Sequence, residues 1–376
     1  MRRRRFVSGT LGALSGIALG PAAARAAAST PRTQGWQAVP APGSTPAAQL
    51  RRIAAAGPAL AWAVGEEGLG TSSPARALAM VWNGSAWSKT DLSPLAYPGR
   101  LTDVAGVCAD AAWSVGSPTG GASPLLRWDG TTWREAAFPG RGEPDVRLSA
   151  VAVGADRRVW VTGTRDGSNR LLHRDGRQWQ WLDPLPAPGV NLYRVVLRTP
   201  DEVWVCGDQA AGGGWTGFVA RWNGSWTVLP PLTGLRQTIA DVHAVAADDV
   251  WAVGNEFGVG GPPGRPGNPI LRHWDGTAWN QVDAGFPLGS LSSIAGDAQG
   301  RPAWISAWNH QDQTRSTYLR HDAGTWTVVR GPAGPAPAPY VNDLARIPGT
   351  SGYWSSGMTR AVPYPPTEAY TERFDA

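Results

Sequence analysis

Tryptophan recurs at near-regular intervals along this chain, which has 21 tryptophans among its 376 residues. A large aromatic ring has to be packed or put to use, so its spacing constrains the fold. Seven tryptophans head a phrase of the type Trp-Ala-Val-Gly and recur about every 47 residues, at Trp62, Trp113, Trp160, Trp204, Trp251, Trp304 and Trp354. A period of this length is typical of repeat architectures, and it predicts seven units.

Each unit contains four short apolar phrases. In one unit they begin at Ile239, Trp251, Ile270 and Trp279. The phrases are rich in Val, Leu and Trp and are bounded by Gly, Pro, Asp or Asn, which is the pattern of β-strands. No window keeps the spacing of an amphipathic helix over three turns. Four strands per unit predict an all-β fold, a seven-bladed β-propeller of four-stranded antiparallel blades.

The seventh unit has only three of its four phrases. Residues 341–376 supply these three, and a matching fourth phrase, Trp followed by an apolar residue and Pro, occurs from Gly35 to Pro40. A closed ring leaves no strand edge unpaired. We therefore expect residues 35–40 to complete the blade formed by residues 341–376, so that residues 35–376 form a single propeller domain.

The tryptophans of the four phrases are predicted to pack between blades. Eighteen of the 21 fall on the second, third or fourth strand of a unit. Trp181, Trp215 and Trp308 remain. Trp181 lies two residues after Trp179 and therefore on the same strand face, where packing is expected.

The first 26 residues read as an export signal. The run Arg-Arg-Arg-Phe-Val at positions 3–7 resembles the twin-arginine motif, a mildly apolar stretch follows, and Ala24-Arg25-Ala26 fits a small-x-small cleavage site. Residues 27–34 then form a short linker. We expect a secreted, extracellular protein that uses twin-arginine export and does not insert into a membrane.

Removal of the signal takes the 34 basic residues down to 29, which equals the number of acidic residues. A neutral surface has no general attraction for nucleic acid. We therefore expect no nucleic-acid partner, and we expect a monomer.

The phrase Trp-Ala-Val-Gly followed by Arg-x-Trp-Asp-Gly-x-x-Trp resembles the repeat of tectonin-type propellers over nearly all of the chain after the signal. The turns Asp275–Trp279 and Asp322–Trp326 are similar to the Asp-box of sialidase-like propellers, although most copies are one residue short and lack the leading Ser. Tectonin relatives are commonly lectins, so the resemblance implies a propeller that binds surface glycans. The Asp-box is structural and implies no sialidase activity.

One end of a propeller, here called the loop face, carries the loops between strands 2 and 3 and those leading to the next blade. Variable loops on a rigid ring commonly bind ligands. We expect Trp215 and Trp308 in two such loops, with His310, Asp312 and Arg315 following Trp308. A Trp ring beside amide, acid and guanidinium groups suits sugar recognition, because the ring stacks on the apolar face of a pyranose. The alternative is that both rings only cover neighbouring loops.

The third residue of each first strand forms a column around the axis. Its charged members are Arg52, Asp103, Arg194, Asp241 and Asp343. Such a ring is able to hold a cation, with calcium as the candidate, or the anionic part of a ligand. The alternative is a self-satisfied ring of salt bridges and water. No other cofactor is expected.

The leading hypothesis is a secreted protein that binds carbohydrate or cell-envelope glycan. The five histidines show no metal-ligand spacing, and no catalytic motif is present, so no catalytic residue is assigned. One alternative is a carbohydrate-active enzyme, either a sialidase-like hydrolase or a polysaccharide lyase; for the lyase, His310, Arg315 and Tyr340 form the best trio. A protein-interaction scaffold is the second alternative.

Overall fold

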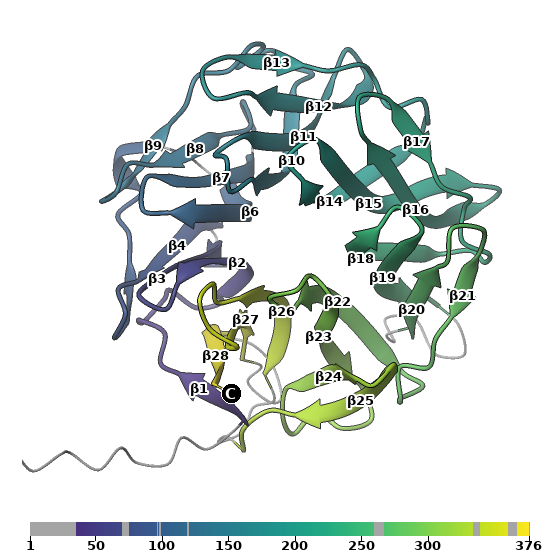
Figure 1. Cartoon of the computed structure of the whole chain (residues 1–376). Coiled ribbons are helices and arrows are strands. Elements are labelled where there is room, and N and C mark those ends of the chain that lie inside the picture. The colour runs from purple at the N-terminus through teal and green to yellow at the C-terminus, as the bar shows by residue number, and fades with distance from the viewer. Residues whose placement is uncertain are drawn as a thin grey trace, which may run out of the picture. The chain divides into compact units, whose positions relative to one another are not determined.

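The computed structural model describes residues 35–69, 75–95, 97, 99–118, 120–258, 267–333, 339–359 and 367–375. They form seven four-stranded antiparallel sheets, arranged as blades around a central channel (Figure 1). The predicted seven-bladed propeller is confirmed. The predicted signal and linker, residues 1–34, lie outside the described residues. In the part of the chain that is described, no helix has the length and apolar character needed to span a membrane.

The first six blades each use four consecutive strands. Their bounds are, for blade 1, β2 (Gln49–Gly57), β3 (Leu60–Glu67), β4 (Arg76–Trp82) and β5 (Trp87–Lys89); for blade 2, β6 (Gly99–Cys108), β7 (Ala111–Pro118), β8 (Leu125–Trp128) and β9 (Trp133–Glu135); for blade 3, β10 (Arg147–Val153), β11 (Val159–Arg165), β12 (Ser168–Arg174) and β13 (Trp179–Trp181); for blade 4, β14 (Val190–Thr199), β15 (Glu202–Ala211), β16 (Gly214–Trp222) and β17 (Trp226–Val228); for blade 5, β18 (Gln237–Ala246), β19 (Asp249–Glu256), β20 (Asn268–Trp274) and β21 (Trp279–Gln281); and for blade 6, β22 (Gly289–Gly296), β23 (Pro302–Asn309), β24 (Thr317–Asp322) and β25 (Thr325–Arg330). A single 3-10 turn, η1 (Ser93–Leu95), links blades 1 and 2.

Blade 7 is completed from the other end of the chain. It contains β26 (Tyr340–Arg346), β27 (Tyr353–Met358) and β28 (Ala369–Asp375), and its outer strand is β1 (Gly35–Val39). β1 pairs antiparallel with β28, from Gly35 opposite Asp375 to Val39 opposite Thr371. The predicted closure by the N-terminal strand is therefore confirmed.

Second-strand tryptophans pack between neighbouring blades, as predicted. Trp62 of blade 1 is fully buried and lies 6.4 Å from Trp128 of blade 2, centroid to centroid. Trp354 of blade 7 is also fully buried and meets Trp82 of blade 1 at 4.9 Å. Both contacts are edge-to-face, an arrangement that adds to the burial of apolar area. Trp181 packs as well, and its indole N–H donates to the carbonyl of Pro139 at 2.8 Å.

The Trp-Asp/Asn-Gly phrases are turns between strands 3 and 4. The carboxylate of Asp275 accepts hydrogen bonds from the Thr277 hydroxyl and from the backbone N–H groups of Thr277 and Ala278. These hydrogen bonds lower the pKa of Asp275. Gly276 follows with φ of 92°, a conformation that favours glycine. Asn83 plays the same part in blade 1.

Every first strand carries a β-bulge at the same place, a feature that the sequence analysis missed. In β18, Ile239 pairs with Gly254 and Asp241 pairs with Val253, so Ala240 has no partner of its own. We call the seven extra residues the bulge ring; they are Arg51, Thr102, Ser149, Tyr193, Ala240, Ser292 and Asn342.

The bulge accounts for the glycine of the Trp-Ala-Val-Gly phrase. Gly254 faces the residue just before the bulge, and a Cβ at Gly254 would lie 1.9 Å from the carbonyl oxygen of Thr238. Both groups belong to paired backbones, so neither can move away cheaply. Blade 6 carries the same bulge with Ala307 at this position.

Gly254→Ala is expected to lower the free energy of unfolding by about 1–3 kcal/mol, because the added methyl group overpacks the bulge. Ala307→Gly is the matched control, since it removes a methyl group at the same position of blade 6; its expected cost is about 0.5–1 kcal/mol. Urea unfolding of both variants measures the difference. An unchanged midpoint for Gly254→Ala would show that the bulge does not require glycine.

Candidate functional site

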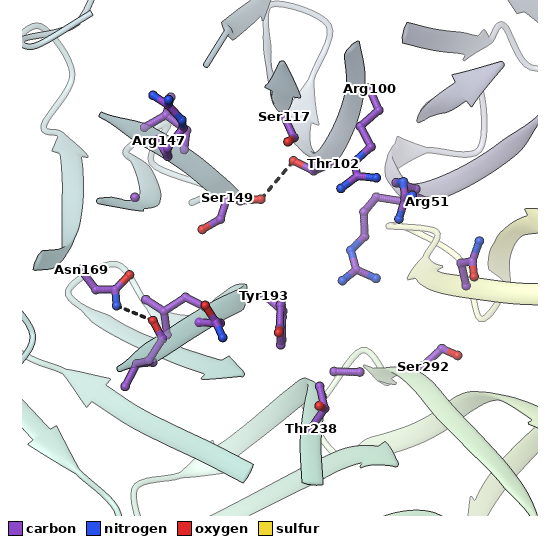
Figure 2. A pocket seen from close by; sticks show the side chains of 18 of the residues that line it. Arg51, Arg100, Thr102, Ser117, Arg147, Ser149, Asn169, Tyr193, Thr238 and Ser292 are labelled. Atoms are coloured by element: carbon purple, nitrogen blue, oxygen red, sulfur yellow. Dashed lines mark hydrogen bonds between the residues drawn. The ribbon is translucent and has the colours of Figure 1, made fainter. Parts of the chain in front are cut away.

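A pocket of about 760 Å³ lies at the mouth of the central channel. First strands contribute their starting residues, and second strands contribute residues near their ends, such as Ser117 and Asn255, which places the pocket on the loop face. All seven residues of the bulge ring line it. Figure 2 shows Arg51, Ser149 and Tyr193 approaching the pocket from different blades. The bulges therefore bring one extra side chain per blade to this mouth.

The predicted column of charged residues meets beside this mouth. Arg194 contacts three carboxylates: its Nη1 is 3.0 Å from Asp103 Oδ1, its Nε 3.3 Å from Asp241 Oδ1 and its Nη2 3.4 Å from Asp343 Oδ1. Arg52 lies 3.8 Å from Asp103 and 3.7 Å from Asp343. Burial opposes the charge of Arg194, but the three carboxylates outweigh it and raise the pKa of Arg194.

The same carboxylates join first strands of neighbouring blades. Each is at most 1% exposed and accepts a backbone N–H from the next blade; the pairs are Asp103 with Val151 at 2.9 Å, Asp241 with Ile294 at 3.2 Å and Asp343 with Ile53 at 2.9 Å. Burial raises the pKa of Asp103, and the charges of Arg194 and Arg52 oppose this. The cluster thus links neighbouring blades and stabilises the ring.

These residues do not fit a calcium site. The guanidinium groups of Arg52 and Arg194 contact the carboxylates that a calcium ion would need. Among the described residues, no group of three or more His, Cys, Asp or Glu side chains is arranged to hold a metal ion. The geometry favours the self-satisfied ring of salt bridges that the sequence analysis left as the alternative.

A second concavity, of about 520 Å³, adjoins the mouth between blades 4 and 5. Three aromatic residues line it, Tyr193, Trp215 and Phe257, and we call them the aromatic ledge. Phe257 is 42% exposed and Tyr193 39% exposed, which is unusual for rings of this size. The Trp215 and Phe257 ring centroids lie 6.2 Å apart. Tyr193 lines both concavities, so the ledge and the mouth are continuous.

Asp208 organises the polar side of the ledge. Its carboxylate is 6% exposed and accepts hydrogen bonds from the Tyr193 hydroxyl at 2.6 Å and the Asn191 amide at 2.8 Å. Burial raises the pKa of Tyr193, and the hydrogen bond to this carboxylate adds to the effect. The Trp215 indole N–H donates to the Thr238 hydroxyl at 3.2 Å. Aromatic faces and polar groups are therefore held together by fixed hydrogen bonds.

The loop assignments of the two remaining tryptophans are wrong. Trp215 lies within β16 and pairs with Ala210, because β15 and β16 extend to a tight turn at residues 212–213. Trp308 lies within β23 and pairs with Ser290. Turn-rich composition suggested loops here, whereas two Gly residues are enough to close the long hairpin of blade 4.

The structure brings together only part of the predicted loop-face set. Trp308 contacts His310 at 5.3 Å and Tyr340 at 5.6 Å, and Tyr340 lines the channel mouth. Asp312 instead pairs with Arg330 at 2.9 Å, in the same blade. Arg315 is exposed, and its carbonyl accepts a hydrogen bond from Arg330. Trp215 lies two blades away from Trp308.

Sequence reasoning missed three residues of the site, Tyr193, Asp208 and Phe257. Tyr193 had a usable signal, because it stands one residue before Arg194 of the charged column, where most other repeats carry a polar residue. Asp208 and Phe257 had no such signal: Asp208 follows Gly207 within β15 and Phe257 follows the end of β19, and the residue at each of these places differs from blade to blade.

Comparison with known proteins gives the fold and no family. No family model matches the chain, and no curated protein sequence matches it. Among solved structures, YCF48 from Cyanidioschyzon merolae is 16% identical, covers 91% of this chain and 98% of its own, and has a TM-score of 0.57. A catalytically inactive virginiamycin B lyase from Staphylococcus aureus with quinupristin is 10% identical, over 92% and 100%, with a TM-score of 0.61. The SapL1 lectin in complex with alpha methyl fucoside is 13% identical, over 78% and 98%, with a TM-score of 0.50. The chain is thus similar in fold to solved structures that bind ligands as different as quinupristin and alpha methyl fucoside, and its function has to be argued from its own site.

Proposed function

We propose that this chain is a secreted recognition protein that binds a saccharide of a carbohydrate or cell-envelope glycan at the loop face. The aromatic ledge carries the proposal. It offers partly exposed rings from two blades beside a buried carboxylate, and it opens into a polar mouth lined by hydroxyl, amide and guanidinium groups.

This combination matches the surface of a sugar. A pyranose has apolar C–H faces that stack on aromatic rings and hydroxyl groups that bond to planar polar groups. Phe257 and Tyr193 supply exposed ring surface, and Asp208 and Asn191 supply fixed polar groups. SapL1, a propeller of similar fold, has been seen with alpha methyl fucoside, which supports saccharide binding by this architecture.

Phe257→Ala is expected to weaken saccharide binding about 5- to 30-fold, because a lost stacking contact and its buried area are together worth about 1–2 kcal/mol. A glycan array first identifies a ligand, and titration calorimetry then compares the wild type with the variant. Val228→Ala is the matched control, since Val228 has a similar exposed fraction, 39%, on the outer strand of blade 4. Equal loss in both variants, or no loss in Phe257→Ala, would contradict a site on the ledge.

The alternative of a carbohydrate-active enzyme rests on fewer contacts than saccharide recognition does. His310 and Tyr340 both contact the Trp308 ring, and Tyr340 lines the mouth, while Arg315 is exposed and its carbonyl accepts a hydrogen bond from Arg330. Release of unsaturated or reducing ends from a polysaccharide, abolished by His310→Ala, would favour it. Absence of any saccharide binding or cleavage would favour the protein-interaction scaffold.

A further inference from the structure

Three arginines from consecutive blades line the channel mouth. We call Arg51, Arg100 and Arg147 the arginine arc. Arg51 belongs to the bulge ring of blade 1, while Arg100 and Arg147 stand just before the aliphatic residue that precedes the bulge in blades 2 and 3. In Figure 2, Arg51 and Arg100 approach one another at one side of the pocket, opposite Asn169.

Two of these arginines, Arg100 and Arg147, have no acidic partner among the described residues. Arg51 is paired with the buried carboxylate of Glu66, through Nε at 2.9 Å. Arg147 donates only to the carbonyl of Val146, at 2.8 Å, and Arg100 makes no side-chain hydrogen bond or ion pair within the described parts of the chain. Both side chains are exposed. The mouth therefore carries two uncompensated guanidinium groups, and no carboxylate belongs to its described lining.

The guanidinium groups of Arg51 and Arg100 are close enough to repel one another. Burial lowers the pKa of Arg51, and the charge of Arg100 contributes further to the lowering. An anion placed between such groups relieves the repulsion and forms charge-assisted hydrogen bonds, which are about twice as strong as neutral ones. A planar carboxylate suits the fork of a guanidinium especially well.

We propose that the arginine arc is the subsite for the carboxylate of an acidic saccharide, such as a uronic acid. This inference rests on the saccharide recognition proposed above and specifies its substrate class. Around the mouth, Arg100, Arg147 and Tyr193 come from blades 2, 3 and 4, and the ledge continues onto blade 5. One oligosaccharide can therefore place a carboxylate on the arc and a neighbouring ring on the ledge, with hydroxyl groups of the bulge ring between them.

The test compares trigalacturonate with its methyl ester, which has the same ring and hydroxyl groups without the charges. Titration calorimetry is expected to show tighter binding of the acid by the wild type, an advantage that falls at high salt because the contacts are ionic. The double variant Arg100→Gln with Arg147→Gln is expected to lose about 10-fold in affinity for the acid and little for the ester. Arg177→Gln, an exposed arginine in the 3–4 turn of blade 3 on the opposite face, is the matched control. Thermal melting checks that all variants remain folded.

The possible outcomes separate this inference from the proposed function. Equal binding of acid and ester, unchanged in the double variant, overturns the arginine subsite and leaves saccharide recognition intact. Failure to bind the acid, the ester and every glycan of an array overturns both. Binding of penta-glutamate but of neither saccharide also overturns the inference, and it assigns the mouth to an acidic peptide.

Discussion

Arg194→Met is expected to destabilise the propeller by about 3–5 kcal/mol, because it leaves three buried carboxylates facing one another without their common cation. Arg194 is 16% exposed and contacts Asp103, Asp241 and Asp343, each of which is at most 2% exposed. Methionine preserves much of the side-chain volume, so the loss reports on charge more than on packing. Chemical unfolding near neutral pH measures it.

The difference in unfolding free energy between Arg194→Met and the wild type should shrink as the pH falls. Burial raises the pKa of Asp103, and loss of the Arg194 charge raises it further above the unfolded value of about 3.9, so the folded variant takes up a proton that the unfolded chain does not. Stability tied to such raised pKa values is present at low pH and is lost as the pH rises through them. The difference from wild type should therefore be smaller near pH 4 than near pH 7.

Arg157→Met is the control for Arg194→Met. Arg157 is 60% exposed and pairs at 2.9 Å with Asp110, which is 53% exposed, so its expected cost is below about 1 kcal/mol. A loss of stability in Arg194→Met that is equally small, or that grows toward low pH, would contradict the claim that the salt-bridge cluster links the blades.

Deletion of residues 27–43 is expected to lower the melting temperature by about 10 °C or more. The deletion removes β1 and with it the outer strand of blade 7. Trp36 of that strand is 5% exposed, stacks on Tyr318 of blade 6 at 3.9 Å and meets Trp304 edge-on at 5.5 Å. Loss of one such buried ring costs about 3–5 kcal/mol, before the lost strand pairing is counted.

Two further proteins make the deletion interpretable. A chain lacking only residues 27–34 keeps β1 and should melt like the mature protein. Trp36→Ala should fall between that chain and the full deletion. If the chain without residues 27–43 melts at the temperature of the control, the N-terminal strand does not hold the ring closed.

The repeat made the ring predictable. Seven tryptophans at one strand position give the number of blades, and the fourth phrase that the last unit lacks leaves the N-terminal segment as the strand that closes the ring. The charged column was also predictable, since Arg52, Asp103 and Asp241 occupy equivalent positions of the repeat. Its role in linking neighbouring blades was not predictable, because a list of charges does not show from which backbone N–H groups the carboxylates accept hydrogen bonds.

The binding mouth was only partly predictable. A bulge shifts one residue per first strand without changing the hydrophobic pattern, so the pocket that it creates left no clear signal. Trp215 was correctly singled out as unexplained by the ring, but its place in a strand depends on how far a two-glycine hairpin extends. Phe257 and Asp208 come from different blades, and the packing of blade 5 against blade 4 brings them together.

The central claim is that the loop-face mouth of the channel is the ligand site. A crystal structure of the protein soaked with mixed neutral and acidic oligosaccharides tests it most directly. The account predicts a sugar over Tyr193 and Phe257, with an acidic group reaching Arg100 and Arg147. A sugar bound at the opposite face or at the outer edges of the blades, with the mouth empty, would contradict it.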